Sequence, residues 1–290
     1  MDARKLSALY GLKWNPFLED IPVEALCKTP RIDHFAWRIE DLVMHGGFAL
    51  VTGDVGAGKS TVLRLLAERL SALRDVVVGE VQRPQSRVTD FYRELGDLFG
   101  FPVSTSNRWG AHKAVRAKWQ EHIHQTLFRP ILLIDEAQEM SAPLLAELRL
   151  LGSTKLDTCT IITVVLCGDR RIEEHLRTPD LAPVNSRIRA RLVLEAETPE
   201  TLGTMLCHIL TVSGNPALMT DELQRTLCEH AAGNRRVLMN LCNELLALAV
   251  TKNAKRLDEE LYLEMTSAEL RPARPKPVAQ PPRSKSSTRR

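Results

Sequence analysis

Long apolar runs are missing from this sequence. The longest candidate, Ile161 to Cys167 with its neighbours, is far shorter than the roughly 20 residues that a membrane-spanning helix needs. The first apolar stretch, Leu6 to Phe17, is interrupted by Lys13 and Pro16, so it lacks the continuous hydrophobic region of a signal peptide. We therefore expect a cytoplasmic protein without a membrane segment.

Paired cysteines are also missing. None of the six cysteines forms a C-x-x-C pair, and most stand within apolar segments, as reduced core cysteines do. His122 and His124 are close in sequence, but residues two apart on a helix do not face each other. These patterns argue against a zinc site.

Acidic residues are absent from positions 271–290, which contain seven basic residues and five prolines. The formal net charge of +3 becomes −4 when these seven cations are left out, so the basic character of the chain resides in this tail. The tail has almost no large apolar side chains and is predicted to be disordered. Its cations suit a weak, salt-sensitive attraction to nucleic acid, and a solubilising end without a partner is the open alternative.

The chain as a whole has the composition of a soluble globular protein. Its 290 residues are 44% hydrophobic and 26% charged, which is enough to build a substantial core. One α/β domain with a smaller companion fits this length.

A glycine-rich segment follows the apolar run Phe48 to Val51. It matches the phosphate-binding pattern G-x-x-x-x-G-K-[ST] and consists of Gly53, Asp54, Val55, Gly56, Ala57, Gly58, Lys59, Ser60 and Thr61. Its glycines let backbone N–H groups surround phosphates, and a helix starting near Lys59 adds its positive end. Lys59 is predicted to reach the β- and γ-phosphates, and Ser60 to hold Mg²⁺. An ordinary strand-to-helix turn would explain the glycines but not the lysine and serine together, so the sequence predicts a nucleoside triphosphate site.

A second motif, Ile131 to Glu136, is an apolar strand that ends in two acids. This is a Walker B pattern. It assigns Asp135 to Mg²⁺ and Glu136 to orienting and deprotonating the attacking water, which favours hydrolysis over binding alone. The alternative, in which the two acids only cap the next helix, is weakened by the phosphate-binding loop in the same chain.

Strand and helix patterns alternate along the first two thirds of the chain. Five strands are predicted at 48–52, 76–81, 131–134, 160–167 and 191–194. Helices are predicted at 35–44, 59–73, 88–99, 112–128, 141–151 and 170–177, with Ser141 as the cap of the fifth. This alternation predicts a P-loop α/β fold with a parallel five-stranded sheet flanked by helices.

Beyond Glu197 only helical periodicity remains, as in the apolar stripe of Leu223, Leu227 and Ala231. We therefore divide the chain into an N-terminal segment (1–47), a nucleotide-binding domain (48–196), an all-α lid domain (197–270) and the basic tail (271–290).

In this order of domains the sequence resembles the AAA+ ATPases, and within them the ExeA-type ATPases and the transposition ATPases of the TnsC and TniB type. The resemblance spans about residues 8 to 250. The motifs that carry it are Tyr10-Gly11-Leu12, Asn15-Pro16-Phe17, Gly46 to Gly53, Asp135-Glu136-Ala137-Gln138, Glu147 to Leu151, Val165 to Gly168, and Gly233-Asn234-Arg235-Arg236 with Leu241-Cys242.

The resemblance implies further site residues. Arg187, before the last strand, matches an arginine finger that acts on the nucleotide of a neighbouring subunit, and Arg189 is the alternative. Arg236 matches a lid residue that contacts the γ-phosphate, and Arg235 is the alternative. Asp169 stands where relatives place a γ-phosphate sensor, although an acid there would repel phosphate and could instead cap the next helix.

The resemblance also implies ATP and Mg²⁺ as cofactors, since no guanine-reading N-K-x-D motif follows the fourth strand. The expected role is a homo-oligomer that assembles on duplex DNA and recruits a transposase. Basic residues that could reach DNA phosphates are Arg83, Arg87, Arg108, Lys113, Arg116 and Lys118. For each of them an ordinary surface charge is the open alternative. The alternatives are a secretion-pathway ATPase of the ExeA type, a nucleotide-dependent scaffold without DNA, and a small-molecule kinase, which the Asp135-Glu136 pair and the lid disfavour.

Overall fold

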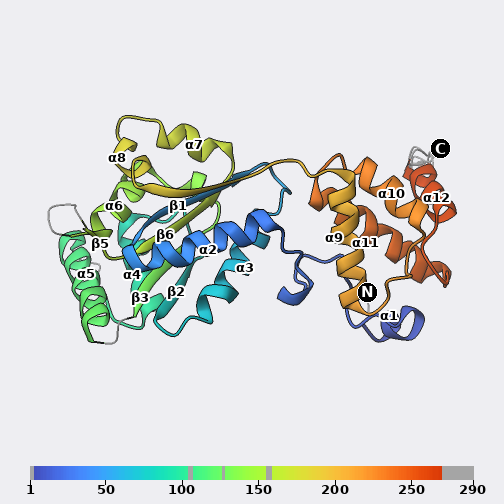
Figure 1. Cartoon of the computed structure of the whole chain (residues 1–290), viewed down its shortest axis with the longest axis horizontal. Coiled ribbons are helices and arrows are strands. Elements are labelled where there is room, and N and C mark those ends of the chain that lie inside the picture. The colour runs from blue at the N-terminus through green and yellow to red at the C-terminus, as the bar shows by residue number, and fades with distance from the viewer. Residues whose placement is uncertain (1–2, 104–106, 126–127, 155–158, 270–290) are drawn as a thin grey trace, which may run out of the picture.

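The computed structural model describes residues 3–103, 107–125, 128–154 and 159–269. Figure 1 shows two lobes, one built around a β-sheet and one made only of helices. The basic tail lies outside the described residues, so the prediction made for it stays a prediction.

The sheet lobe contains five parallel strands in the order β2-β3-β6-β1-β7. Their bounds are β1 (Gly47–Gly53), β2 (Val76–Val81), β3 (Arg129–Ile134), β6 (Thr163–Gly168) and β7 (Ile188–Leu194). The predicted fold class is confirmed, because both the strand number and the parallel pairing match. Since all strands run in the same direction, the segments after β1, β3 and β6 meet at one edge of the sheet.

Both faces of the sheet are covered by helices, and the strands are correspondingly apolar throughout. Along β1, Ala49 and Val51 contribute to the core cluster that contains α2 and α3, while Phe48 and Leu50 contribute to the opposite one. The first face is covered by α2 (Pro30–His45) and α3 (Lys59–Ser71). The second is covered by α4 (Val88–Phe99), α5 (Arg108–Gln125), α6 (Ala142–Gly152), α7 (Arg170–Leu176) and α8 (Ala182–Asn185).

Two arginines of α2 cover the backbone of the edge strand β7. Arg31 donates to the carbonyl oxygen of Val193 at 2.9 Å, and Arg38 donates to that of Arg189. Carbonyl groups on an edge strand otherwise remain open to a further strand.

Some predicted boundaries are wrong. The predicted strand 160–167 is split, because Thr160 pairs in a small antiparallel sheet of β4 (Ser153–Thr154) and β5 (Cys159–Thr160), and β6 begins only at Thr163. Continuous apolar sequence does not reveal where backbone pairing changes partner. Ser141 stands at the cap position of α6, but its side chain makes no capping hydrogen bond. β7 starts three positions before its predicted first residue, Arg191.

The helical lobe consists of α9 (Pro199–Ser213), α10 (Asp221–His230), α11 (Arg235–Lys252) and α12 (Glu259–Glu269). Side chains of Thr198, Thr220 and Asn234 cap the first three of these helices. The change from sheet to helices falls between the end of β7 at Leu194 and the start of α9 at Pro199, near the predicted boundary at residue 197. We keep that boundary as a proposal. No helix among the described residues is both long and apolar enough to cross a membrane.

The N-terminal segment belongs in space to both lobes. Its helix α1 (Ala3–Tyr10) lies against the helical lobe, as Figure 1 shows. Asn215 donates to the carbonyl oxygen of Tyr10 at 2.9 Å, and Asn15 donates to Asn243 of α11 at 2.8 Å. The chain then passes through the short 3₁₀ helix η1 (Val23–Ala25), which contacts both α9 and α3, before it enters α2. The segment therefore runs along the boundary of the two lobes.

Candidate functional site

The glycine-rich loop joins β1 to α3 at the edge of the sheet where the strands end. Gly56 (φ 82°) and Gly58 (φ 95°) have positive φ angles that side chains disfavour. Gly58 is the N-cap of α3 and supplies no side-chain cap, so the first N–H groups of this helix are available to an anion. Lys59 is buried and donates to the carbonyl oxygens of Gly53 and Asp54, each at 3.1 Å. Its ammonium group therefore lies against the loop.

The serine of the loop and the first acid of the second motif are in contact. Ser60 Oγ donates to Asp135 Oδ2 at 2.9 Å, although the two residues come from different elements. A hydroxyl beside a carboxylate is a donor set that suits Mg²⁺, which usually takes one or two protein oxygens together with waters and substrate phosphates. Within the described ranges no group of three or more His, Cys, Asp or Glu residues could hold a metal ion by itself.

The second acid, Glu136, follows in a left-handed backbone conformation (φ 51°, ψ 38°). This conformation costs a non-glycine residue about 1–3 kcal/mol, and such strained residues cluster at active sites and ligand clamps. The N–H of Glu136 donates to Asp135 Oδ1 at 2.9 Å. Asp135 thus uses one oxygen to fix Glu136 and the other to meet Ser60.

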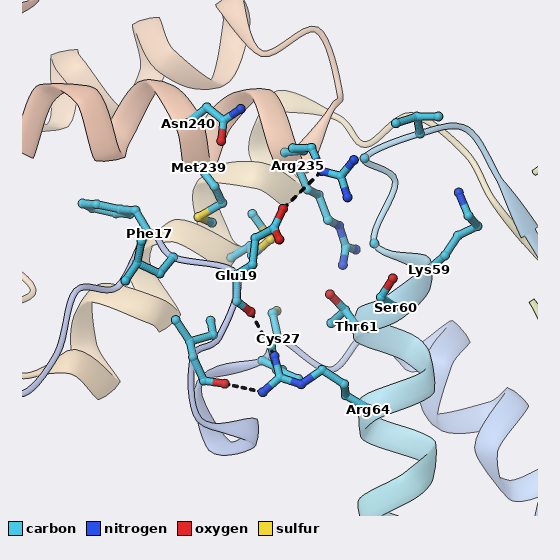
Figure 2. A pocket seen from close by; sticks show the side chains of 18 of the residues that line it. Phe17, Glu19, Cys27, Lys59, Ser60, Thr61, Arg64, Arg235, Met239 and Asn240 are labelled. Atoms are coloured by element: carbon cyan, nitrogen blue, oxygen red, sulfur yellow. Dashed lines mark hydrogen bonds and ion pairs between the residues drawn. The ribbon is translucent and has the colours of Figure 1, made fainter. Parts of the chain in front are cut away.

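A pocket lies beside these residues, between the two lobes, and encloses about 250 Å³. Figure 2 shows how the start of α3, the N-terminal segment and α11 converge on it. One end is polar and contains the loop, Ser60 and Glu136. The other end is lined mainly by apolar or sulfur-containing side chains: Phe17, Leu18, Ile21, Leu26, Cys27, Met205, Ile209 and Met239. An apolar slot next to an anion-binding loop suits a nucleotide, with the base in the slot and the phosphates at the loop.

Arg64 of α3 fastens the N-terminal wall of this pocket. Its guanidinium donates to the carbonyl oxygens of Glu19, at 3.1 Å, and Ile21, as the dashed lines in Figure 2 show. Phe17 of this slot belongs to the motif Asn15-Pro16-Phe17 quoted above, whereas Arg64 belongs to no short motif and was missed in the sequence.

The lid helix α11 touches the phosphate-binding loop through its cap. Asn234 accepts from the N–H groups of Arg236 and Val237, and its Nδ2 donates to the carbonyl oxygen of Val55 at 2.9 Å. A Cβ at Gly56 would come within 2.2 Å of Asn234 Oδ1, so this close approach requires glycine. Asn234 was part of a recognised motif, but its contact with the loop was not predicted.

The two lid arginines have different surroundings. Arg235 is buried, forms an ion pair with Glu197 and lies against Gly58, where a Cβ would come within 3.0 Å of its Nη1. Arg236 also lines the pocket, but its side chain is 54% exposed and forms an ion pair with Glu19 at 3.7 Å. Arg235 therefore connects Gly58 of the loop with Glu197, which lies between β7 and α9, whereas Arg236 is held loosely.

Asp169, at the end of β6, caps α7. Its side chain accepts from the N–H of Arg171 at 2.8 Å and forms an ion pair with the guanidinium of the same residue. These contacts with Arg171 hold the pKa of the Asp169 carboxyl below its usual value. The helix-cap interpretation of Asp169 is confirmed.

Arg187 directly precedes β7, so it lies where the parallel strands begin, whereas the phosphate-binding loop lies where they end. Phe48 pairs with Ile188 at one end of the two strands, and Gly53 pairs with Leu194 at the other. At about 3.3 Å per residue, this places Arg187 roughly 20 Å from its own loop. The structure therefore does not bring Arg187 or Arg189 into the pocket with the other predicted residues.

Comparison with known proteins supports the same fold. The model of the family described as AAA domain matches residues 42–176. The general secretion pathway protein A of Aeromonas hydrophila is 27% identical over 256 residues, which cover 86% of this chain and 45% of that protein. The chain thus spans less than half the length of this curated relative.

Two solved structures are similar over most of the chain. The Aeropyrum pernix ORC2 protein in its ADPNP–ADP complexes has a TM-score of 0.72 and 17% identity, covering 90% of this chain and 72% of that one. The Aeropyrum pernix ORC1 protein in complex with DNA has a TM-score of 0.66 and 16% identity, covering 88% and 68%. At this identity the likeness concerns the fold alone, which is that of P-loop AAA+ proteins.

Proposed function

We propose that this protein binds ATP with Mg²⁺ and hydrolyses it. The observation that carries the proposal is the convergence of Lys59, the Ser60–Asp135 pair and Glu136 on one pocket that also has an apolar slot. Each group alone has a structural explanation. Together they supply a cation for phosphate, oxygen ligands for a metal and a carboxylate for water.

Each of these residues has a separate task in the proposed reaction. The N–H groups of the loop and the start of α3 hold the phosphate oxygens, and Lys59 turns from the carbonyls of Gly53 and Asp54 to the β- and γ-phosphates. Ser60 and Asp135 hold Mg²⁺, which when bound neutralises charge on the phosphates. Glu136 orients the attacking water and accepts its proton. All of these groups serve to position and to stabilise charge.

The lid completes the proposed site. We assign the γ-phosphate contact to Arg236, because its guanidinium is loosely held, whereas Arg235 is engaged with Glu197. A residue that senses the γ-phosphate must be able to move toward it. Arg235 then keeps the lid in register with the loop.

A neighbouring copy supplies the remaining cation. Arg187 lies too far from its own pocket to reach it, so as an arginine finger it acts only on the nucleotide of another subunit. Hydrolysis therefore depends on homo-oligomer formation. Arg189, the second residue of β7, is the alternative finger.

For the biological role we propose an ATP-dependent transposition helper that assembles on duplex DNA in the cytoplasm and recruits a transposase. One observation that favours a DNA partner is an exposed face of α5. Trp109 is 72% exposed and stacks on His112 with ring centroids 5.4 Å apart and planes 4° from parallel. Lys113 and Arg116 lie on the side of the helix that carries Trp109, because residues four and seven apart share a face. The cations of this face suit the phosphates of duplex DNA, and the exposed ring of Trp109 offers an apolar contact beside them.

The second candidate role is in a secretion pathway. It is favoured by the 27% identity to the general secretion pathway protein A, which extends over most of this chain. In that role ATP would drive assembly of an envelope machine and DNA would have no effect.

One experiment tests the activity and separates the two roles. The steady-state ATPase rate is measured with and without duplex DNA over a range of salt concentrations, with Glu136→Gln as the inactive control. Stimulation that fades with salt supports the DNA role, since phosphate contacts release counterions. Turnover that ignores DNA supports the secretion role. Absence of any turnover that depends on Glu136 contradicts the proposed hydrolysis.

A further inference from the structure

Gln138 is buried, with 5% of its surface exposed, and its side-chain amide bridges two elements of the site. It lies in the short 3₁₀ helix η2 (Ala137–Glu139), directly after β3. Its Nε2 donates to Glu136 Oε2, and its Oε1 accepts from the backbone N–H of Asp169 at 3.1 Å. One side chain thus joins the carboxylate at the end of β3 to the backbone at the end of β6.

The end of β6 is shaped to admit this amide. A Cβ on Gly168 would come within 2.4 Å of Gln138 Oε1, a distance that real Cβ atoms essentially never show. Gly168 does not have a positive φ angle, so backbone conformation gives no reason for glycine at this position. The reason is the space that the amide of Gln138 occupies.

Glu136 needs such a partner if it is to act on water. Its backbone is fixed in the left-handed conformation by the strand end and by Asp135, but its long side chain keeps several rotatable bonds. A hydrogen bond to one carboxylate oxygen removes most of that freedom and leaves the second oxygen for water. The Gln138 side chain that donates this bond also accepts from the N–H of Asp169. The position of the Glu136 carboxylate therefore follows the position of Asp169, the N-cap of α7.

We propose that Gln138 is a positioning residue that fixes the carboxylate of Glu136 and couples it to the junction of β6 and α7. The inference rests on the proposed function, in which Glu136 acts on water. It adds that displacing the amide of Gln138 changes the hydrolysis rate without changing how tightly nucleotide is held. The side-chain hydrogen bonds of Gln138 described above go to Glu136 and Asp169 and not to the phosphate-binding loop, and Gln138 does not line the pocket.

The test compares Gln138→Leu with Gln125→Leu. Both substitutions remove a glutamine amide that donates to a nearby glutamate, since Gln125 Nε2 donates to Glu121 Oε1 at 3.3 Å on the exposed surface of α5. For Gln138→Leu we expect kcat for ATP to fall by about 10- to 100-fold, the range in which misplacing a reacting group by about 1 Å lowers rates. The Kd for a fluorescent ATP analogue should stay within about twofold, and Gln125→Leu should change neither quantity.

A double variant separates positioning from a merely structural role. If Gln138 acts through Glu136, then Gln138→Leu should lower the residual single-turnover rate of Glu136→Gln no further. An additive loss, or a fall in nucleotide affinity as large as the fall in kcat, overturns the inference. Wild-type kcat in the single variant Gln138→Leu, under conditions where the single variant Glu136→Gln has no turnover, also overturns the inference. If Glu136→Gln itself keeps full turnover, the proposed function fails and not only the role of Gln138.

Gly168→Ala provides a second route if Gln138→Leu does not fold. Its added methyl group displaces the amide of Gln138 while leaving the glutamine present. We expect the same loss of kcat with unchanged nucleotide affinity. Wild-type kcat in a folded Gly168→Ala variant overturns the coupling between the β6–α7 junction and Glu136.

Discussion

Asn234 donates a hydrogen bond to the carbonyl oxygen of Val55, 2.9 Å away, and so connects the cap of a lid helix to the phosphate-binding loop. The carbonyl that it holds belongs to the same loop whose N–H groups face the phosphates in the proposed site. Fixing the carbonyl side of a peptide also fixes the direction of its N–H side, because the peptide unit is planar. The lid therefore helps to set the loop for phosphate binding.

We expect Asn234→Ala to weaken ATP binding by about 2- to 12-fold, corresponding to one hydrogen bond of about 0.5–1.5 kcal/mol. The loss of the α11 cap should lower the free energy of unfolding by about 1 kcal/mol in addition. Isothermal titration and urea unfolding measure the two effects. Thr220→Ala is the matched control. Thr220 caps α10 by accepting from the N–H of Leu223 at 3.2 Å, and this cap does not involve the phosphate-binding loop. This variant should lower stability only. If Asn234→Ala binds ATP as tightly as Thr220→Ala and the parent protein do, the contact with Val55 has no role in binding.

Lys59→Ala should abolish measurable nucleotide binding, because it removes the charged donor closest to the loop. Glu136→Gln should instead keep ATP bound and lower kcat by about 10²- to 10⁴-fold, the usual contribution of a general base. Equilibrium binding of a fluorescent ATP analogue, together with phosphate release, distinguishes the two. Full turnover in Glu136→Gln would remove Glu136 from the catalytic assignment.

Arg235→Ala and Arg236→Ala should differ in kind. Arg235 is paired with Glu197 and buried, so its removal should lower the free energy of unfolding by about 1–3 kcal/mol. Arg236→Ala should leave stability within about 0.5 kcal/mol of the parent and reduce affinity for ATP more than for ADP. Thermal unfolding and competition between the two nucleotides give both answers. A selective loss of ATP affinity in Arg235→Ala alone would exchange the two roles.

Arg187→Ala should spare nucleotide binding and lower turnover by about 10³-fold under conditions where the protein assembles. Mixing supplies the decisive measurement: Arg187→Ala carries an intact pocket, and Lys59→Ala carries an intact finger. Turnover in the mixture should exceed that of either variant alone. If the mixture is as inactive as its parts, Arg187 does not act between subunits, and Arg189→Ala becomes the variant to examine.

Arg108→Ala should lower the free energy of unfolding at neutral pH. Arg108 forms an ion pair with Glu147, whose side chain is only 3% exposed and also accepts from the hydroxyl of Tyr92. Burial alone would raise the pKa of Glu147, but the hydrogen bonds from Arg108 and Tyr92 outweigh it and hold the pKa below its ordinary value of 4.5. Since Arg108 itself is 58% exposed, we expect a loss of about 1–3 kcal/mol at pH 7.

The sign of the pH dependence follows from the direction of this pKa shift. A carboxyl whose pKa is lowered by folding stabilises the protein above its unfolded pKa and loses that contribution as pH falls through the folded pKa. The stability difference between the parent and Arg108→Ala should therefore shrink below about pH 4.5. Lys118→Ala, which breaks the exposed pair with Glu121, should leave stability close to that of the parent at any pH. A pH-independent difference for Arg108→Ala would show that lost packing, and not the carboxylate, is responsible.

The sequence predicted those parts of the molecule that depend on neighbouring residues. The strand Val76–Val81 and the helix Val88–Phe99 have the predicted bounds, because periodicity and short connections are local properties. The loop and the two acids were found because their spacing is fixed by phosphate and metal. By contrast, Asn234 and Val55 are 179 positions apart, and the sequence around neither residue predicts their contact. Gln138 was visible as part of a motif, but the direction of its amide depends on the packing of β3 against β6.

Arg31 and Arg38 close the outer side of β7 by donating to its carbonyl oxygens. A second copy that extended the sheet at this edge would first have to displace both guanidinium groups and leave them without these acceptors. Strand addition is thus opposed next to the very residue, Arg187, that must approach another subunit. The proposed assembly then has to be held there by side chains, which can separate and re-form with each cycle of nucleotide exchange, whereas a shared sheet would lock the copies together.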